Sequence, residues 1–171
     1  MRSIYLTSHH LSEYMLVTDI DDTIKEIRST IYRMRTPLGP GSSLRDRVLQ
    51  VLSELAPTLG HEPASTFTGP LDVMVTEDLV DDVVAVLRAS LTGVARHSAA
   101  DTTGVCLAVL TDRRELHVTV TDNGTAWNES ARERDLAGIR ARAEERGGRF
   151  VIESTVDQVR GTRVLWIVPT P

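Results

Sequence analysis

Hydrophobic and polar positions repeat along the chain with two different periods, and their order predicts the architecture. Apolar residues at helical spacing predict helices at about 10–35, from a cap at Ser42 or Ser43 to about 59, at 77–97 and at 135–146. Alternating and short apolar runs predict strands at 65–69, 103–111, 114–122, 149–155 and 162–168. Because the helices come first and the strands cluster late, we expect an α+β fold with helices on one face of a mixed sheet.

The first predicted helix differs from the others in having a narrow apolar seam. Its seam residues follow one another at alternating spacings of three and four, as in a coiled coil. They are Val17, Ile20, Ile24, Ile27, Ile31 and Met34. We expect this seam to support a homodimer, with packing of the helix on its own domain as the alternative. Prolines and glycines at 37–41 predict a linker between an N-terminal helical part, 1–36, and a domain at 42–171.

Composition narrows the class of protein. The 171 residues are 41% hydrophobic and 25% charged, as in an ordinary globular protein. A net charge of −5 argues against a nucleic-acid partner. The chain has no apolar stretch of the ~20 residues that span a bilayer and no secretory signal, so we expect no membrane segment in it and a cytoplasmic location. Cys106, the single cysteine, lies in an apolar run, which predicts a reduced core residue.

The strand predicted at 114–122 carries the most specific signal. Its period of two places Asp122 at the end of a row formed by Leu116, Val118 and Val120. A carboxylate in an apolar row needs a hydrogen-bond donor, and the exocyclic amine of a purine is one such donor. Gly124 allows a sharp turn after it. However, Asp-Asn-Gly is also an ordinary turn tripeptide, so this pattern alone leaves both interpretations open.

Further motifs occur in a fixed order with this one. They are the helix Leu136–Glu144, the segment Gly147–Phe150 and the pair Gly161-Thr162. In this order they resemble the ATP-binding domain of sensor histidine kinases, in the superfamily shared with gyrase, Hsp90 and MutL. Asp21–Ile31 is similar to the end of the dimerisation and phosphoacceptor domain in the subfamily whose kinases often carry GAF input domains. The resemblance covers residues 16–169 and implies a two-layer α/β sandwich of the Bergerat type.

The resemblance implies nucleotide-binding roles for five residues. Asp122 would accept a hydrogen bond from the adenine amine, and Gly124 would form the turn that contacts the base. Thr162 would support the same purine through a water, or it is simply a strand residue. Arg96 and His97 would lie near the phosphates, or they form a solvated helix end with a capping role.

The segment 125–134 corresponds to the family's flexible lid. Trp127 within it would either pack over the cleft, in the space of a nucleotide, or anchor the lid or a partner. The family has a Gly-x-Gly hinge before the following helix, where this chain has Glu133-Arg134-Asp135. We expect Asp135 to cap that helix and to repel a triphosphate.

Two replacements decide the expected activity. Ala89 and Gly93 stand where the family has a Glu and an Asn that bind Mg²⁺ and orient a water or substrate. Neither side chain can ligate a metal or accept a proton, so we expect no catalytic residue, no metal ligand and no bound Mg²⁺. Gly93 also costs the helix ~1 kcal/mol relative to alanine, which either close approach of a ligand or drift would explain.

We therefore expect a degenerate histidine-kinase-like module, a pseudokinase of two-component signal transduction. It would bind ATP weakly or not at all, lack autokinase activity and act as a regulatory or dimerising module. His9 and His10 lack the following acid of a phosphoacceptor. The alternatives are an active histidine kinase fragment or an anti-sigma-type serine kinase, with Asn123 or Glu129 as metal ligand, and a binder of another small molecule.

Overall fold

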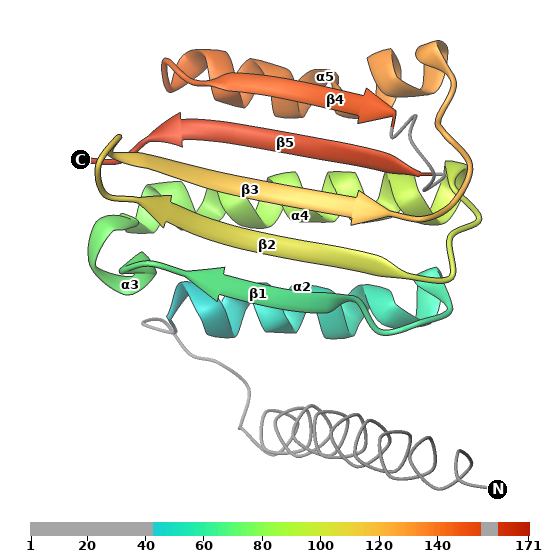
Figure 1. Cartoon of the computed structure of the whole chain (residues 1–171), viewed down its shortest axis with the longest axis horizontal. Helices are drawn as coiled ribbons and strands as arrows, with labels where there is room; N and C mark the ends of the chain where they lie inside the picture. The colour runs from blue at the N-terminus through green and yellow to red at the C-terminus, as the bar shows by residue number, and fades with distance from the viewer. Residues whose placement is uncertain (1–42, 155–160) are drawn as a thin grey trace, which may run out of the picture. The chain divides into compact units, whose positions relative to one another are not determined.

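The structure is a computed structural model that describes residues 43–154 and 161–171 (Figure 1). Residues Gly41–Pro171 form one compact unit. The predicted N-terminal helix, its seam and the linker at 37–41 lie outside the described residues, so their structure and the proposed dimer stay predictions.

The described ranges contain helices and strands in nearly the predicted order. The helices are α2 (Leu44–Leu59), α3 (Leu71–Met74), α4 (Glu77–His97) and α5 (Glu129–Glu145). The strands are β1 (Ala64–Thr68), β2 (Thr103–Leu110), β3 (Glu115–Asp122), β4 (Arg149–Ser154) and β5 (Thr162–Pro169). The Ser43 hydroxyl accepts a hydrogen bond from the Asp46 amide at 3.3 Å, and this caps α2 at one of the two predicted serines.

The strands form one mixed sheet in the order β1-β2-β3-β5-β4. Strand β1 runs parallel to β2, and the other neighbours are antiparallel. Figure 1 shows α2, α4 and α5 together on one face of this sheet. The predicted α+β architecture, with helices on one face of a mixed sheet, is confirmed. Within the described ranges, no helix is both long enough and apolar enough to cross a membrane.

The core lies between α4 and the three central strands. Every second residue of β2 and β3 is buried, as the alternating pattern predicts. The core residues of these strands and β5 include Val105, Leu107, Leu116, Val118, Val120, Val164 and Trp166. Full burial of each such aliphatic side chain contributes about 1.5–3 kcal/mol, so this layer fixes the end of β3, where Asp122 lies, firmly against α4.

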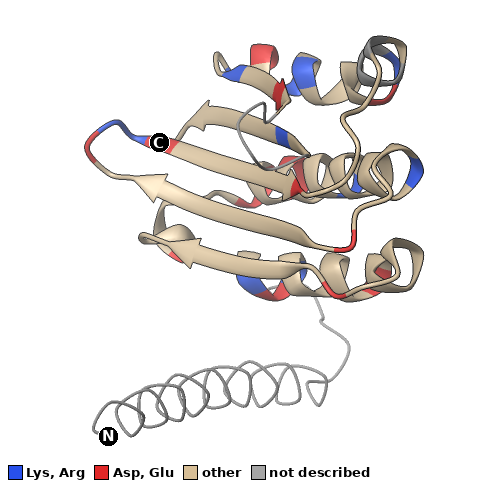
Figure 2. Cartoon of the chain, turned by 45° about the vertical axis from the view of Figure 1, so that its right-hand side comes forward, with Lys and Arg blue, Asp and Glu red and all other residues tan. Residues whose placement is uncertain are grey.

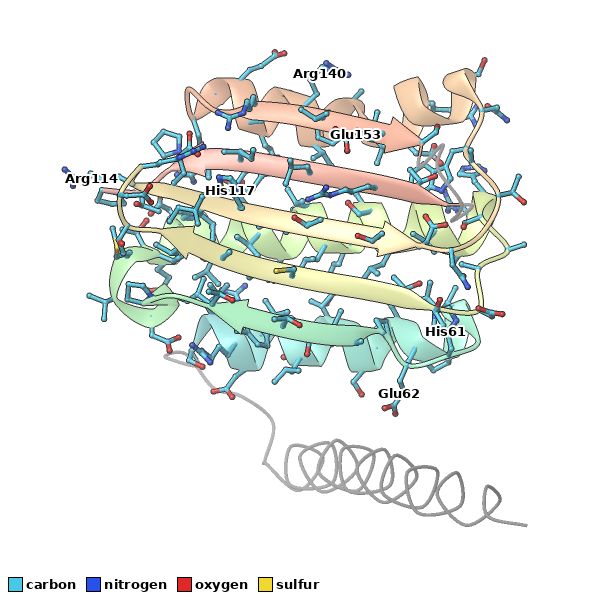
Figure 3. All side chains as sticks on the ribbon, viewed as in Figure 1. His61, Glu62, Arg114, His117, Arg140 and Glu153 are labelled. Carbon is cyan, nitrogen blue, oxygen red and sulfur yellow. The ribbon has the colours of Figure 1, made fainter. Side chains whose placement is uncertain are left out.

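Charged side chains lie mainly on the helices and loops, while the strands carry few (Figure 2). On the face without helices, His117 of β3 is half-buried and its Nε2 lies 2.8 Å from Glu115 Oε2 (Figure 3). On the face that carries the helices, the Arg140 guanidinium of α5 lies 5.3 Å from the centre of the Phe150 ring on β4. This cation–π contact helps to hold α5 to the sheet edge.

Two predictions about local structure were wrong, and one short helix was not predicted. Cys106 is a free thiol, as predicted, but it is only partly buried and not a core residue, because the inward positions of β2 are the odd-numbered ones. Helix α5 begins at Glu129, whereas the sequence predicts a start at 135. The short helix α3 was not predicted, because its four residues are too few to show a period.

Candidate functional site

Asp122 ends β3 with its carboxylate inside the protein, 3% exposed. One oxygen, Oδ1, accepts hydrogen bonds from the Ser98 hydroxyl and, at 2.9 Å, from the Gly124 amide. The other oxygen, Oδ2, is buried and has no partner among the described residues. An unsatisfied buried polar group costs about 1–3 kcal/mol. A ligand N–H group at Oδ2 would remove that cost, so Asp122 is built as an acceptor with one vacant oxygen.

Thr162 lies on the strand beside Asp122. The register of β3 and β5 pairs Thr121 with Arg163, so the next position sets Thr162 opposite Asp122. Thr162 is 1% exposed, and its Oγ1 has no hydrogen-bond partner in the described part of the chain. The structure thus places two buried oxygen atoms on neighbouring strands, and neither has a partner within residues 43–154 and 161–171. Together they can meet a flat ligand edge that carries both donors and acceptors.

Two glycines let the backbone close around this carboxylate. A Cβ atom at Gly124 would overlap the carbonyl and hydroxyl oxygens of Ser98. A Cβ atom at Gly161 would overlap the carbonyl oxygen of Asp122, and its φ of +150° is one that other residues rarely adopt. Gly124 therefore has a positional role beside Asp122. Ser98, which the sequence analysis missed, is the helix C-cap directly after His97.

Arg96 and His97, which the sequence predicts near the phosphates, differ in their exposure and in their contacts. Arg96 is exposed and forms no ion pair within 43–154 and 161–171. His97 Nε2 lies 2.7 Å from Asp135 Oδ2, so the imidazole is already bonded to α5. This hydrogen bond from His97 holds the pKa of the Asp135 carboxyl below its usual range, and Arg134 contributes to the same shift. Asp135 therefore remains a carboxylate at neutral pH.

Trp127 lies directly against α4. Its side chain is 2% exposed, and its ring centre is 5.8 Å from that of His97. A Cβ atom at Gly93 would lie within 3.0 Å of three atoms of the indole ring. The indole Nε1 is buried and has no partner among the described residues. Close approach does explain the glycine at 93, but the approaching group is the protein's own tryptophan ring.

Helix α5 occupies most of the segment predicted as a lid. Its first residue is Glu129, and Asp135 lies inside the helix, so the prediction that Asp135 caps its N-terminus was wrong. Arg142, near the end of α5, and Arg146, directly after it, both donate hydrogen bonds to Asp82 of α4, whose side chain is 12% exposed. This contact was not predicted from the sequence. The features that could have predicted it are an acidic residue among the buried positions of α4 and two arginines spaced four residues apart.

Asn123, an alternative metal ligand in the sequence analysis, has a structural role. Its Oδ1 accepts hydrogen bonds from the amides of Asp101 and Thr102, both at 3.1 Å. Its Nδ2 donates to Asp101 Oδ1 at 2.5 Å. These bonds join the start of the turn after β3 to the loop before β2. Among the described residues, no three acidic, histidine or cysteine side chains are grouped so that they could hold a metal ion.

Ala89, on the same helix as Gly93, is half-buried and packs against the core. Around these two positions the protein presents a methyl group, the indole ring and the His97–Asp135 pair. Asp122 Oδ2 and Thr162 Oγ1 are therefore the polar atoms at which the base of a nucleotide could form hydrogen bonds. The residues present do not fit a metal-bound phosphate chain next to Gly93, since no oxygen ligand points there from Ala89 or Gly93.

No family model matches the chain. Similar solved structures include full-length ShkA in complex with AMPPNP, at 17% identity and a TM-score of 0.62, covering 97% of this chain and 38% of that chain. The ATP-binding domain of PrrB from Mycobacterium tuberculosis has 17% identity and a TM-score of 0.58, covering 76% and 96%. The catalytic domain of the histidine kinase ThkA has 14% identity and a TM-score of 0.54, covering 74% and 90%.

At such low identities the likeness is one of fold. The chain spans 38% of the length of ShkA and nearly all of the PrrB domain. The subfamily with GAF input domains stays a prediction. The part of the chain that the structure describes has the fold of the ATP-binding domain of histidine kinases.

Proposed function

We propose that this chain is a histidine-kinase-like module of two-component signalling that retains the base-binding part of a nucleotide site and has lost phosphotransfer. The observation that carries the proposal is the contrast within one site. Asp122 keeps a buried carboxylate oxygen that has no hydrogen-bond partner among the described residues, while Ala89 and Gly93 on α4 offer no metal ligand.

Phosphoryl transfer depends on positioning and on a metal that neutralises charge on the phosphates. The resemblance assigns those tasks to the positions of Ala89 and Gly93, and Trp127 additionally fills the space next to Gly93. We therefore propose weak ATP binding at most, no Mg²⁺ dependence and no autokinase activity. The kinase alternative is weakened because Asn123, one of its two metal ligands, is fully engaged in loop contacts.

A module without phosphotransfer can still regulate through binding. The apolar seam of the predicted N-terminal helix, centred on Ile24 and Ile27, supports self-association as the output. In this proposal, ligand binding at Asp122 or contact with a regulatory protein is communicated through a dimer formed by residues 17–34.

Isothermal titration with ADP and ATP, with and without Mg²⁺, tests the proposal together with a labelled-phosphate transfer assay. We expect weak or absent binding that does not depend on the metal, and no labelled protein. Submicromolar, Mg²⁺-dependent ATP binding or labelling of the chain or a partner would refute it. The positive control restores the family residues in the triple variant Ala89→Glu/Gly93→Asn/Trp127→Ala, in which the tryptophan change makes room for the new asparagine.

A further inference from the structure

We infer that this site selects an uncharged planar heterocycle that carries an amine, such as adenine or its nucleoside, over a nucleoside triphosphate, and that Trp127 determines this selectivity. The inference rests on the proposed function, because it concerns the ligand class of the same site. It adds a residue role that follows from packing and charge around α4.

The first step is the chemistry of the two vacant oxygens. Asp122 Oδ2 and Thr162 Oγ1 are buried on neighbouring strands, and neither has a hydrogen-bond partner among the residues that the structure describes. A carboxylate oxygen accepts only, so its partner must bring an N–H or O–H group. A hydroxyl both donates and accepts, so the adjacent ligand atom can be a ring nitrogen. An amine next to a ring nitrogen on a flat heterocycle meets both requirements.

The second step is the position of the indole ring relative to Asp122. Ser98, which donates to Asp122, follows Gly93 by five residues at the end of α4. At about 1.5 Å per residue, the Gly93–Trp127 contact lies about 7.5 Å along the helix from that hydrogen bond. A ligand that is anchored at Asp122 and extends along α4 therefore meets the ring of Trp127.

The third step is the charge beyond the ring. His97 is bonded to the Asp135 carboxylate, and the Arg134 guanidinium also lies 3.3 Å from Asp135. The His97 imidazole and the Arg134 guanidinium are thus both already paired with the Asp135 carboxylate. A triphosphate would have to displace a 2%-exposed indole ring and compete with Asp135 for His97. A neutral ligand does neither, and the unpartnered indole N–H can donate to its sugar or ring.

Titration calorimetry of the whole chain with adenine, adenosine, ATP and ATP with Mg²⁺ tests the inference. We expect adenosine to bind more tightly than ATP by about tenfold or more, which corresponds to about 1.4 kcal/mol, with no effect of Mg²⁺. In Trp127→Ala this preference should shrink by about tenfold, because ATP gains space. Trp127→Phe, a smaller change to the fold, should shift the preference in the same direction.

Trp166→Phe is the matched control, because Trp166 is buried in β5 as a core residue. This variant should keep the wild-type preference and leaves Trp127 as the only tryptophan, so that its fluorescence should change on adenosine binding. Asp122→Asn should abolish binding of every purine tested.

ATP binding as tight as adenosine binding would overturn the inference, as would an unchanged preference in Trp127 variants whose circular dichroism shows a folded chain. ATP binding that is as tight as adenosine binding, independent of metal and without phosphotransfer, overturns the inference alone and leaves the proposed function standing. Absence of any purine binding also overturns the inference, whereas the proposed function allows it. Mg²⁺-dependent phosphotransfer overturns the proposed function itself.

Discussion

The indole ring of Trp127 lies against Gly93, and this contact accounts for a glycine in the C-terminal part of a 21-residue helix. A glycine there costs ~1 kcal/mol relative to alanine. The cost is offset because a Cβ atom would come within 3.0 Å of three ring atoms, and the ring itself is 2% exposed. Gly93 is therefore a packing residue whose partner lies 34 positions later in the chain.

Replacement of Gly93 by alanine should destabilise the protein, although alanine favours helices. Overlap with a packed ring costs about 1–3 kcal/mol, which exceeds or cancels the gain in helix propensity. Gly138→Ala is the matched control, because Gly138 lies in α5 and a Cβ there would meet no atom within 4 Å. Urea unfolding should show Gly138→Ala stabilised by up to about 1 kcal/mol and Gly93→Ala less stable than wild type. Equal gains in both variants would mean that Trp127 does not occupy this position.

The Ser98 hydroxyl, which donates to Asp122, should contribute measurably to stability. Ser98→Ala leaves a 3%-exposed carboxylate with fewer donors, and the expected loss is about 1–3 kcal/mol. Ser90→Ala is the control on the same helix, since Ser90 is equally buried but its hydroxyl has no partner within the described residues. That variant should change the free energy of unfolding by less than about 0.5 kcal/mol or stabilise the protein. A loss in Ser90→Ala as large as that in Ser98→Ala would contradict this account.

The contact of Asp82 with two arginines should be the main polar link between α4 and α5. Its side chain is 12% exposed, and Asp82→Ala should lower the free energy of unfolding by about 1–3 kcal/mol, because Arg146 is left partly buried without this partner. The neighbouring Asp81 also pairs with an arginine, Arg47, but its side chain is 68% exposed. Asp81→Ala should therefore cost less than about 1 kcal/mol in the same urea titration. Similar losses at both positions would show that burial does not set the difference.

Periodicity predicted most of the fold but few of its long-range contacts. The two-residue alternation placed Asp122 correctly on the buried face of β3, because parity along a strand is a local property. The same alternation failed for Cys106, where residues on both faces of β2 are apolar or small and the inward set is not distinguishable. The start of α5 was predicted too late because the buried apolar residues of this helix, such as Leu136 and Ile139, lie only in its later turns.

The candidate site shows the same limit. The sequence predicted Asp122 and the glycine turn after it. It did not predict that Ser98 donates a hydrogen bond to Asp122 or that the Trp127 ring packs against Gly93. These contacts join residues 24 and 34 positions apart, and no period within one element specifies its partner in another. The resemblance to a family indicated which positions to compare, but it did not specify that Trp127 packs against Gly93.

The His97–Asp135 pair predicts how stability depends on pH. The pKa of Asp135 is lowered in the folded state, chiefly by the hydrogen bond from His97. Between the folded and unfolded pKa values the folded state binds fewer protons, so stability falls as the pH falls. The contribution of the pair is present above the ordinary aspartate value of about 4 and is lost as the pH drops through the lowered pKa.

Asp135→Asn removes this titration and keeps the size of the side chain. Urea unfolding at about pH 5.5 should show wild type more stable than the variant, and the difference should shrink as the pH is lowered through the depressed pKa of Asp135. Asp112→Asn is the control, since the side chain of Asp112 is 78% exposed and lies 3.9 Å from Arg113, so its difference from wild type should stay near zero over the same pH range. A difference for Asp135→Asn that grows as the pH falls would have the wrong sign. It would show that His97 does not stabilise the ionised carboxylate, and the two helices would then be joined by other contacts.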